Sequence, residues 1–325
     1  MDNFLDDIFA KSTERTKYRF WMISDLQQGN PRWAEAYMTT AMDDMNEMQA
    51  EKLSGICYLG DAAEGRDPEL IKIMLDMQIG KLESLNVPIY YVMGNHEFDY
   101  YHLLNGEKKQ PVIPFYEAVK GRKLWHVVPD QETFWFTHET GDFIFLFFSD
   151  HAAKDGSWCA AHQFLPPPEQ PYPHTKEVWQ AVRDRFADCG KPVFTFAHCA
   201  FPGGNRPSQY LEQILPLPDN FRAHFHGHSH IGDGAWGGKD LYRQVACIDN
   251  HPQMQFDISS LDHMRGTAVR SAFFDYYGDG QYGVFFRDHT NRRWELCNIS
   301  THDAPSRGQA SPPSPSAPRR CGCPA

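Results

Sequence analysis

The sequence predicts an α/β fold in which two mixed β-sheets pack face to face between outer helices. Three observations lead to this prediction: strands alternate with amphipathic helices in the first third of the chain, an antiparallel hairpin pattern follows, and strand-like segments continue toward the C-terminus. The chain has 325 residues, of which 41% are hydrophobic and 22% charged, as in ordinary globular proteins. At roughly 150 residues per domain, we expect one large domain over residues 1–302.

Buried strands are predicted at residues 18–24, 54–59 and 88–93, because short apolar or aromatic runs there end in glycine or polar residues. Helices are predicted over residues 33–53 and 68–85, where apolar residues recur at three- and four-residue steps. The strand ends are spaced by about 35 residues, which is the length of one strand, one crossover helix and two short loops. This pattern is typical of parallel strands joined by right-handed crossovers.

Each of these three strands runs into a polar residue that can bind a metal ion. The first strand is followed by Asp25, the second by Asp61 and the third by Asn95. Because the carboxyl ends of parallel strands lie along one edge of a sheet, where open α/β sheets build their ligand sites, we expect these side chains to converge.

A second sheet is predicted to begin with an antiparallel hairpin, whose strands at 134–137 and 143–149 flank a polar turn. Two more strands are predicted to follow in this sheet, at residues 193–197 and 221–226. Strand-like segments nearer the C-terminus are expected to complete the second sheet, namely residues 241–248, 268–277, 282–287 and 294–299.

Histidines follow the two middle strands of the second sheet: His198 comes after one, and His228 and His230 come after the other. An isolated strand-end Asp commonly caps a helix, and an isolated His is commonly a core residue. Chance placement explains poorly why five strand ends in succession deliver a carboxylate, an amide or an imidazole.

Two segments are expected to lie outside the regular elements. Residues 151–173 mix glycine, proline and aromatic side chains, which predicts an inserted loop on the substrate side, and a helix is predicted to follow from Thr175. Residues 303–325 are rich in Ser and Pro and lack periodic apolar positions, so we expect a disordered tail there.

The charge balance argues against some classes of partner. Lys plus Arg number 31 and Asp plus Glu number 42, so the net charge of −11 repels nucleic acids and anionic membrane surfaces. The apolar runs are far shorter than the roughly 20 residues of a membrane helix. The N-terminal segment is acidic where a signal peptide is basic, which predicts a cytoplasmic protein without membrane or nucleic-acid partners.

The types of donor indicate a centre of two metal ions. Six oxygen and nitrogen donors exceed the needs of one tetrahedral ion, and a carboxylate can bridge two ions about 3.5–4 Å apart. Asp61, the middle carboxylate, is the candidate bridge. Carboxylate, amide and imidazole donors without thiolate suit Mn, Fe or Zn, and the sequence does not distinguish among these three metals.

At these strand ends the chain resembles the calcineurin-like metallophosphoesterase superfamily. The segments that carry the resemblance are Asp25-Leu26-Gln27, Gly60-Asp61, Gly94-Asn95-His96-Glu97, Ala197-His198 and Gly227-His228-Ser229-His230. The resemblance covers about residues 18–300 and implies a four-layer αββα sandwich with a dinuclear metal site. It assigns Asp25 and His230 to the first metal, Asn95, His198 and His228 to the second, and Asp61 to both.

One position departs from the family pattern. Where the family usually has a histidine two residues after the first aspartate, this chain has Gln27, which can offer only an amide oxygen. Gln27 can ligate weakly, bind through a water molecule, or leave a position open at the first metal. The next residue, Gln28, is interpreted as a bystander.

The expected activity is metal-dependent hydrolysis of a small soluble phosphomonoester or phosphodiester. A water bound between two cations is acidified toward neutral pH, so that a metal-bridging hydroxide attacks phosphorus, and His96 supplies a proton to the leaving group. One alternative is a non-enzymatic binding module with an impaired first metal site, and another is a protein phosphatase. The candidate substrate-binding side chains are Lys108, Lys109, Arg122, Lys123 and Arg206, with Trp158, Phe164 and Tyr172 as candidate stacking residues.

Overall fold

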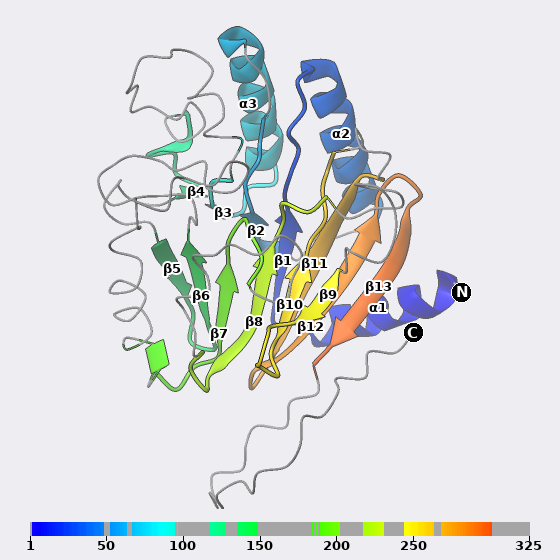
Figure 1. Cartoon of the computed structure of the whole chain (residues 1–325). Coiled ribbons are helices and arrows are strands. Elements are labelled where there is room, and N and C mark those ends of the chain that lie inside the picture. Colours follow the sequence, from blue (N-terminus) through cyan, green and yellow to red (C-terminus); the bar gives the residue numbers. More distant parts are fainter. Residues whose placement is uncertain are drawn as a thin grey trace, which may run out of the picture.

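The computed structural model covers residues 2–48, 53–63, 67–94, 96, 118–127, 135–148, 184, 186–187, 189–201, 217–230, 244–262 and 268–300. These residues form two mixed sheets packed against each other, with α2 and α3 side by side beside the first sheet (Figure 1). This is the α/β sandwich expected from the sequence. The loop predicted at 151–173 and the tail predicted at 303–325 lie outside the described residues, so the proposed domain limits stay predictions.

The first sheet has seven strands in the order β13-β12-β11-β1-β2-β3-β4. Its strands are β1 (Tyr18–Ile23), β2 (Leu53–Tyr58), β3 (Ile89–Tyr91), β4 (Trp125–His126), β11 (Arg270–Gly278), β12 (Gln281–Asp288) and β13 (Arg293–Ile299). Strands β1 to β4 pair in parallel, as the βαβ spacing predicts, and β11 to β13 are antiparallel. The helices that pack on this sheet are α1 (Asp2–Arg15), α2 (Pro31–Glu47) and α3 (Pro68–Glu83).

The second sheet has six strands in the order β5-β6-β7-β8-β10-β9. Its strands are β5 (Trp135–Glu139), β6 (Ile144–Phe148), β7 (Val193–Phe196), β8 (Phe221–His226), β9 (Val245–Cys247) and β10 (Met254–Asp257). The β5–β6 hairpin is antiparallel as predicted, and β6, β7, β8 and β10 follow one another in parallel.

The prediction that the C-terminal strands complete the second sheet is wrong for β11, β12 and β13, which belong to the first sheet. Strand β1 is buried on both faces and pairs with β2 along one edge. The strand that pairs with its other edge must therefore also have apolar residues on both faces. Strand β11 meets this requirement, because Phe274 lies opposite Phe20 in the layer between the sheets and Phe273 lies opposite Trp21 in the layer under the helices. Order along the chain gave no indication of this pairing.

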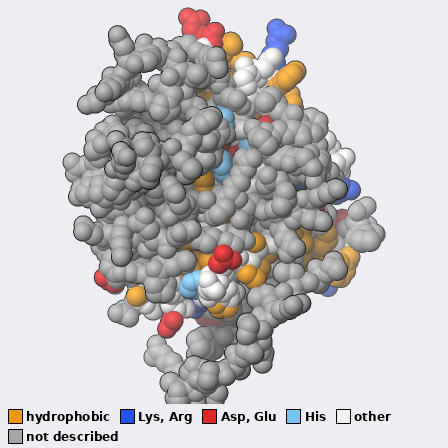
Figure 2. Space-filling view, viewed as in Figure 1, with side chains coloured by type: hydrophobic (Ala, Val, Ile, Leu, Met, Phe, Trp, Pro, Cys, Tyr) orange, Lys and Arg blue, Asp and Glu red, His pale blue; other side chains and the backbone are white. Residues whose placement is uncertain are grey.

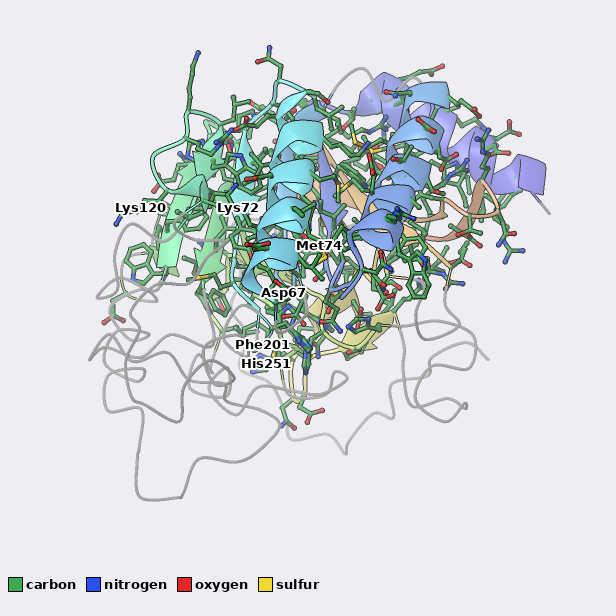
Figure 3. All side chains as sticks on the ribbon, turned by 90° about the horizontal axis from the view of Figure 1, so that it is seen from above. Asp67, Lys72, Met74, Lys120, Phe201 and His251 are labelled. Carbon is green, nitrogen blue, oxygen red and sulfur yellow. The ribbon has the colours of Figure 1, made fainter. Side chains whose placement is uncertain are left out.

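Both crossover helices begin where a side-chain cap precedes a proline. The side chain of Asn30 accepts a hydrogen bond from the backbone N of Arg32 at 3.0 Å, and that of Asp67 accepts one from Glu69 at 2.9 Å. In Figure 3, Asp67 lies at the start of α3, and Met74, fully buried, points from the helix toward the sheet. Helix α2 ends at Glu47, short of the predicted end at residue 53, because Leu53 already pairs with β1.

The core has three layers. The layer between the sheets is rich in aromatic residues, and Phe145 of the second sheet meets Phe20 of the first with ring centroids 4.7 Å apart. The layer under the helices joins α1, α2 and α3 to the first sheet. On the outer face of the second sheet Phe186 belongs to the same buried cluster as Leu146, and its ring centroid lies 6.2 Å from that of Trp135. Phe186 is part of the helix predicted after Thr175, of which only residues 184, 186 and 187 are described.

A buried polar network ties α2 to the first sheet. Arg287 donates two hydrogen bonds to the carboxylate of Asp44, both 2.8 Å long, and His289 Nδ1 lies 2.7 Å from the same carboxylate. His289 Nε2 lies 2.6 Å from the Ser271 hydroxyl, which also accepts a hydrogen bond from Trp21. The Ser–His–Asp order resembles a hydrolytic triad, but Ser271 is only 1% exposed, so no substrate reaches it. The network is therefore structural.

Replacing Asp44 by asparagine should destabilise the fold by about 3–5 kcal/mol, because the buried Arg287 charge then loses its counter-charge. Urea unfolding of Asp44→Asn at neutral pH measures this loss. The neighbouring, exposed Asp43 provides the control, since Asp43→Asn should change stability by less than about 0.5 kcal/mol. Equal effects of the two substitutions would contradict the analysis.

The same network should contribute to the pH dependence of stability. Burial favours a higher pKa for Asp44, but hydrogen bonds from Arg287 and His289 outweigh it and lower the pKa from 3.8 to about 2. A lowered carboxyl pKa stabilises the fold at neutral pH, and this stabilisation is lost as the pH falls from 3.8 toward 2. In Asp44→Asn this part of the acid dependence should be missing from the unfolding free energy.

Candidate metal centre

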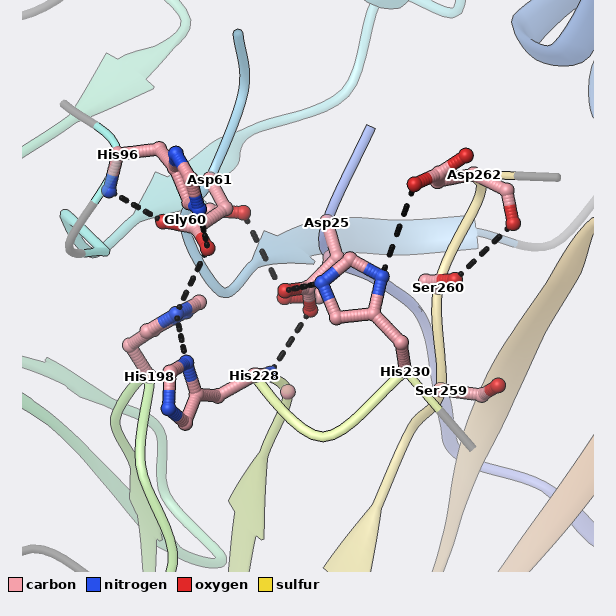
Figure 4. A network of polar contacts seen from close by, with 12 residues as sticks. Asp25, Gly60, Asp61, His96, His198, His228, His230, Ser259, Ser260 and Asp262 are labelled. Atoms are coloured by element: carbon pink, nitrogen blue, oxygen red, sulfur yellow. Dashed lines mark hydrogen bonds and ion pairs between the residues drawn. The ribbon is translucent and has the colours of Figure 1, made fainter. Parts of the chain in front are cut away.

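Polar side chains from both sheets meet beyond the carboxyl ends of four strands (Figure 4). Asp25 follows β1, Asp61 follows β2, His198 follows β7, and His228 and His230 follow β8. We call these five residues the strand-end cluster. All are at most 4% exposed, and Figure 2 shows histidine side chains near the middle of the face seen in Figure 1. The convergence expected from the sequence is therefore present for these five residues.

The donor atoms of the cluster form two groups that share Asp61. One group consists of Asp61, His198 and His228, and the other of Asp25, Asp61 and His230; within each group the donor atoms lie within 4.8 Å of one another. His198 Nε2 lies 3.1 Å from Asp61 Oδ2 and 3.1 Å from His228 Nδ1. His230 Nε2 lies 3.0 Å from Asp25 Oδ1.

These spacings and donor types fit metal ions. Donors bound to one ion at about 2.0–2.1 Å lie about 3 Å from each other, which matches the nitrogen and oxygen separations of the cluster. Buried carboxylates with imidazoles suit divalent transition ions. The arrangement offers two groups of donors that could each hold a metal ion, with Asp61 common to both.

The surroundings of Asp25 favour the negatively charged form of its carboxyl, which can bind a cation. Burial raises the pKa of its carboxyl, but interactions with the adjacent His230, and to a smaller extent with His198 and Ser24, outweigh burial and hold the pKa well below its usual range. The backbone N of His228 donates a 2.9 Å hydrogen bond to Asp25 Oδ2. The carboxylate thus stays ionised although it is completely buried.

The backbone at the cluster is strained. Asp25, Asp61, His228 and His230 have φ angles of 57°, 56°, 69° and 49°, in the left-handed region that non-glycine residues rarely adopt. Such conformations cost free energy and persist where surrounding structure enforces them, commonly at functional sites. Sharp turns directly after the strands aim these side chains at one point.

Gly94 allows the turns after β2 and β3 to approach each other closely at Asp61. A Cβ atom at Gly94 would clash with the side chain and backbone of Asp61 and would lie 2.8 Å from the ring of His198. Glycine at this position therefore has a steric reason, independent of φ.

The remaining predicted site residues differ in how far the structure places them. His96 donates its backbone N–H to Asp61 Oδ1 at 2.8 Å, and its Nε2 lies 3.9 Å from Asp61 Oδ2. Gln27 is 1% exposed at the end of β1. Asn95 lies outside the described residues.

Among the candidate substrate-binding cations, Arg122 makes two hydrogen bonds to the carboxylate of Glu83, at 2.7 and 2.6 Å, so that its charge is already paired. Lys123 is among the described residues, and its role in substrate binding stays a prediction. The other candidates, Lys108, Lys109, Arg206, Trp158, Phe164 and Tyr172, lie outside the described residues.

Sequence reasoning missed two acidic residues next to the cluster. Asp257 ends strand β10, so the strand-end pattern could have indicated it; burial raises its pKa to about 8. Asp262 follows in an irregular segment that carries no sequence signal. Gln28, interpreted as a bystander, is fully buried and donates a 2.5 Å hydrogen bond to Asp262.

Comparison with known families and structures gives the following matches. The family model described as calcineurin-like phosphoesterase matches residues 18–232. A search of curated proteins gives no match.

Several solved structures are similar to the chain. A purple acid phosphatase from yellow lupin (Lupinus luteus) seeds is 12% identical, with a TM-score of 0.46, over 87% of this chain and 53% of the lupin chain. A protein of Thermus thermophilus is 10% identical, with a TM-score of 0.44, over 87% and 98% of the two chains. A phosphatase from Mycoplasma pneumoniae is 10% identical, with a TM-score of 0.39, over 87% and 92%. The chain thus spans about half the length of the lupin phosphatase.

Replacing Gly94 by alanine should displace Asp61 and weaken metal binding at both donor groups, because the new methyl group occupies the space of the Asp61 side chain. Titration with Mn²⁺ measures the effect. Gly80 in α3 is the matched control: no atom lies within 4 Å of a Cβ placed there, so Gly80→Ala should bind Mn²⁺ normally and gain about 0.5–1 kcal/mol of stability. Normal Mn²⁺ binding by Gly94→Ala would refute the steric argument.

Proposed function

Because the chain belongs to the calcineurin-like phosphoesterase family, we propose that it is a phosphoric ester hydrolase that acts on a small soluble phosphate ester at the strand-end cluster. The observation that carries this proposal is the sharing of Asp61 between two buried donor groups. A two-ion centre requires a carboxylate that belongs to the donor sets of both ions.

We assign the first ion to Asp25, Asp61 and His230, with Gln27 as an additional amide ligand. The second ion is assigned to Asp61, His198 and His228. Asn95 completes the second set in this proposal. This assignment of ligands to two ions matches the two donor groups of the cluster, and Asp61 is the residue that both groups share. The ions are Mn, Fe or Zn, since the donors do not discriminate among them.

The protonation of His198 supports its assignment as a ligand. Its Nδ1 lies 2.6 Å from the backbone carbonyl of Leu59, and a carbonyl can only accept a hydrogen bond. The proton therefore sits on Nδ1, which leaves Nε2 with a lone pair directed toward Asp61 and His228. This is the tautomer that a metal ion needs.

The chain's residues have distinct tasks in the proposed reaction. The ions supply Lewis-acid activation of a water molecule and of the phosphoryl oxygens. Asp25 and Asp61 balance the ionic charge, and the strained turns hold their oxygens in place. His96, partly exposed beside Asp61, is proposed to donate a proton to the leaving alkoxide.

The substrate is proposed as a phosphomonoester or a phosphodiester, without choosing between them. The alternatives of a binding module and of a protein phosphatase gain no specific support from the described residues. The five members of the strand-end cluster favour an enzyme, because they are buried and form two candidate donor groups, whereas a decayed site would have lost several donors. Among the described residues, no helix is long and apolar enough to cross a membrane. The cytoplasmic location stays a prediction.

The decisive experiment is the substitution Asp61→Asn. It should lower kcat/KM on p-nitrophenyl phosphate and on bis-p-nitrophenyl phosphate at least about 100-fold, because the bridging charge contributes several kcal/mol to transition-state stabilisation. Metal analysis should fall from two ions per chain. Asp288→Asn is the control, since Asp288 is equally buried but bonds to Asn291 outside the cluster. Hydrolysis of these substrates by Asp61→Asn at the wild-type rate would contradict the proposal.

A second experiment tests the role of His96. If His96 protonates the leaving group, His96→Ala should slow hydrolysis of an alkyl phosphate about 10²–10⁴-fold. It should slow p-nitrophenyl phosphate much less, because nitrophenolate leaves without a proton. Mn²⁺ binding should be unchanged. Equal losses on both substrates would instead assign His96 to positioning Asp61.

A further inference from the structure

A second carboxylate lies behind the metal-facing side of His230. His230 Nε2 faces Asp25 Oδ1 at 3.0 Å, whereas His230 Nδ1, on the opposite side of the ring, lies 3.7 Å from Asp262 Oδ2 (Figure 4). Asp262 is 1% exposed. The imidazole of His230 is therefore placed between two buried carboxylates.

Asp262 is itself held from the other side by Gln28. The Gln28 amide donates a 2.5 Å hydrogen bond to Asp262 Oδ1, and Gln28 is fully buried. Gln28 belongs to the segment that follows β1, three residues after Asp25. The contacts thus form a chain from Gln28 through Asp262 and His230 to Asp25.

The backbone around Asp262 is anchored to the same strand end. The backbone N of Leu261 donates to the carbonyl of Ser24 at 3.0 Å, and the N of Arg270 donates to the carbonyl of Ser260 at 2.9 Å. The Ser260 hydroxyl donates to the carbonyl of Asp262 at 3.2 Å. These bonds tie Asp262 to the residue next to Asp25, so that His230 and Asp25 are located by one connected unit.

We propose that Asp262, held by Gln28, is a positioning residue that orients His230 and sets its tautomer for the first metal ion. At 3.7 Å the negative charge of Asp262 favours a proton on the facing Nδ1 of His230, which leaves Nε2 as the donor toward the metal. The His198 ring also has an oxygen at its Nδ1, the Leu59 carbonyl, at the shorter distance of 2.6 Å. Asp262 differs from that carbonyl in carrying a negative charge, which makes His230 the stronger donor.

The inference rests on the proposed function, because it concerns the affinity of one of the two proposed ions. The test is a titration of the full chain with Mn²⁺. Isothermal calorimetry measures the affinity of each ion, and electron paramagnetic resonance distinguishes coupled pairs of Mn²⁺ ions from single ions. The variant Asp262→Asn keeps the shape of the side chain and an oxygen for Gln28. The variant Gln28→Met keeps the carboxylate and removes its hydrogen-bond donor.

We expect Asp262→Asn to weaken one of the two Mn²⁺ affinities about 10–100-fold, as for other residues that orient metal-bound histidines, and to leave the other unchanged. Gln28→Met should weaken the same site by a smaller factor. In a His230→Ala background, Asp262→Asn should have no further effect, because its action passes through His230. Asp288→Asn, the matched buried carboxylate, should bind both ions as the wild type does.

The outcomes separate the two proposals. Wild-type protein that binds fewer than two Mn²⁺ ions would count against the proposed function itself. Wild type that binds two ions, together with Asp262→Asn that binds both with unchanged affinity, would overturn this inference alone. A further loss caused by Asp262→Asn in the His230→Ala background would also overturn it, because Asp262 would then act by another route. Thermal unfolding without metal checks that the variants are folded.

Discussion

Two buried aspartates, Asp25 and Asp61, impose the constraint on which the site depends. A buried carboxylate without compensation costs several kcal/mol, because it loses its hydration. Backbone N–H groups of His228 and His96 compensate part of this cost, with hydrogen bonds of 2.9 and 2.8 Å to the two carboxylates. Imidazole rings and, in the proposed function, two cations compensate the rest. The strands β1, β2, β7 and β8 and the turns that follow them hold these charges close together.

These strands and turns are stiff enough to hold a strained site. Four cluster residues have left-handed backbones, and glycine at position 94 lets the turns after β2 and β3 touch. Below them the layer between the sheets contains many packed aromatic rings, such as Phe147 with Phe196 and with Phe136 at centroid distances of 4.7 and 4.9 Å. Close packing of this kind leaves little room for relaxation, so the strain is retained at the strand ends.

Accessibility and surroundings, more than residue type, decide what the polar clusters of this protein do. The Asp44–His289–Ser271 network contains the residue types of a hydrolytic site, yet it is sealed beneath α2 and holds the helix to the sheet. The strand-end cluster contains aspartates and histidines as well, but its rings and carboxylates converge on shared points. Asp262 and Gln28 extend this cluster inward, where polar contacts can orient a ligand without touching the substrate.

The parallel strands, the hairpin and the convergence of polar residues at the strand ends could be predicted from the amino-acid sequence; these residues are Asp25, Asp61, His198, His228 and His230. Apolar periodicity and strand-end polar residues are local patterns, and parallel topology places strand ends on one edge. The pairing of β11 to β13 with the first sheet could not be predicted in this way, since edge pairing depends on matching buried faces far apart in the chain. The contact between Gln28 and Asp262 could not be predicted either, because a contact between two irregular segments 234 residues apart leaves no periodic pattern in either segment.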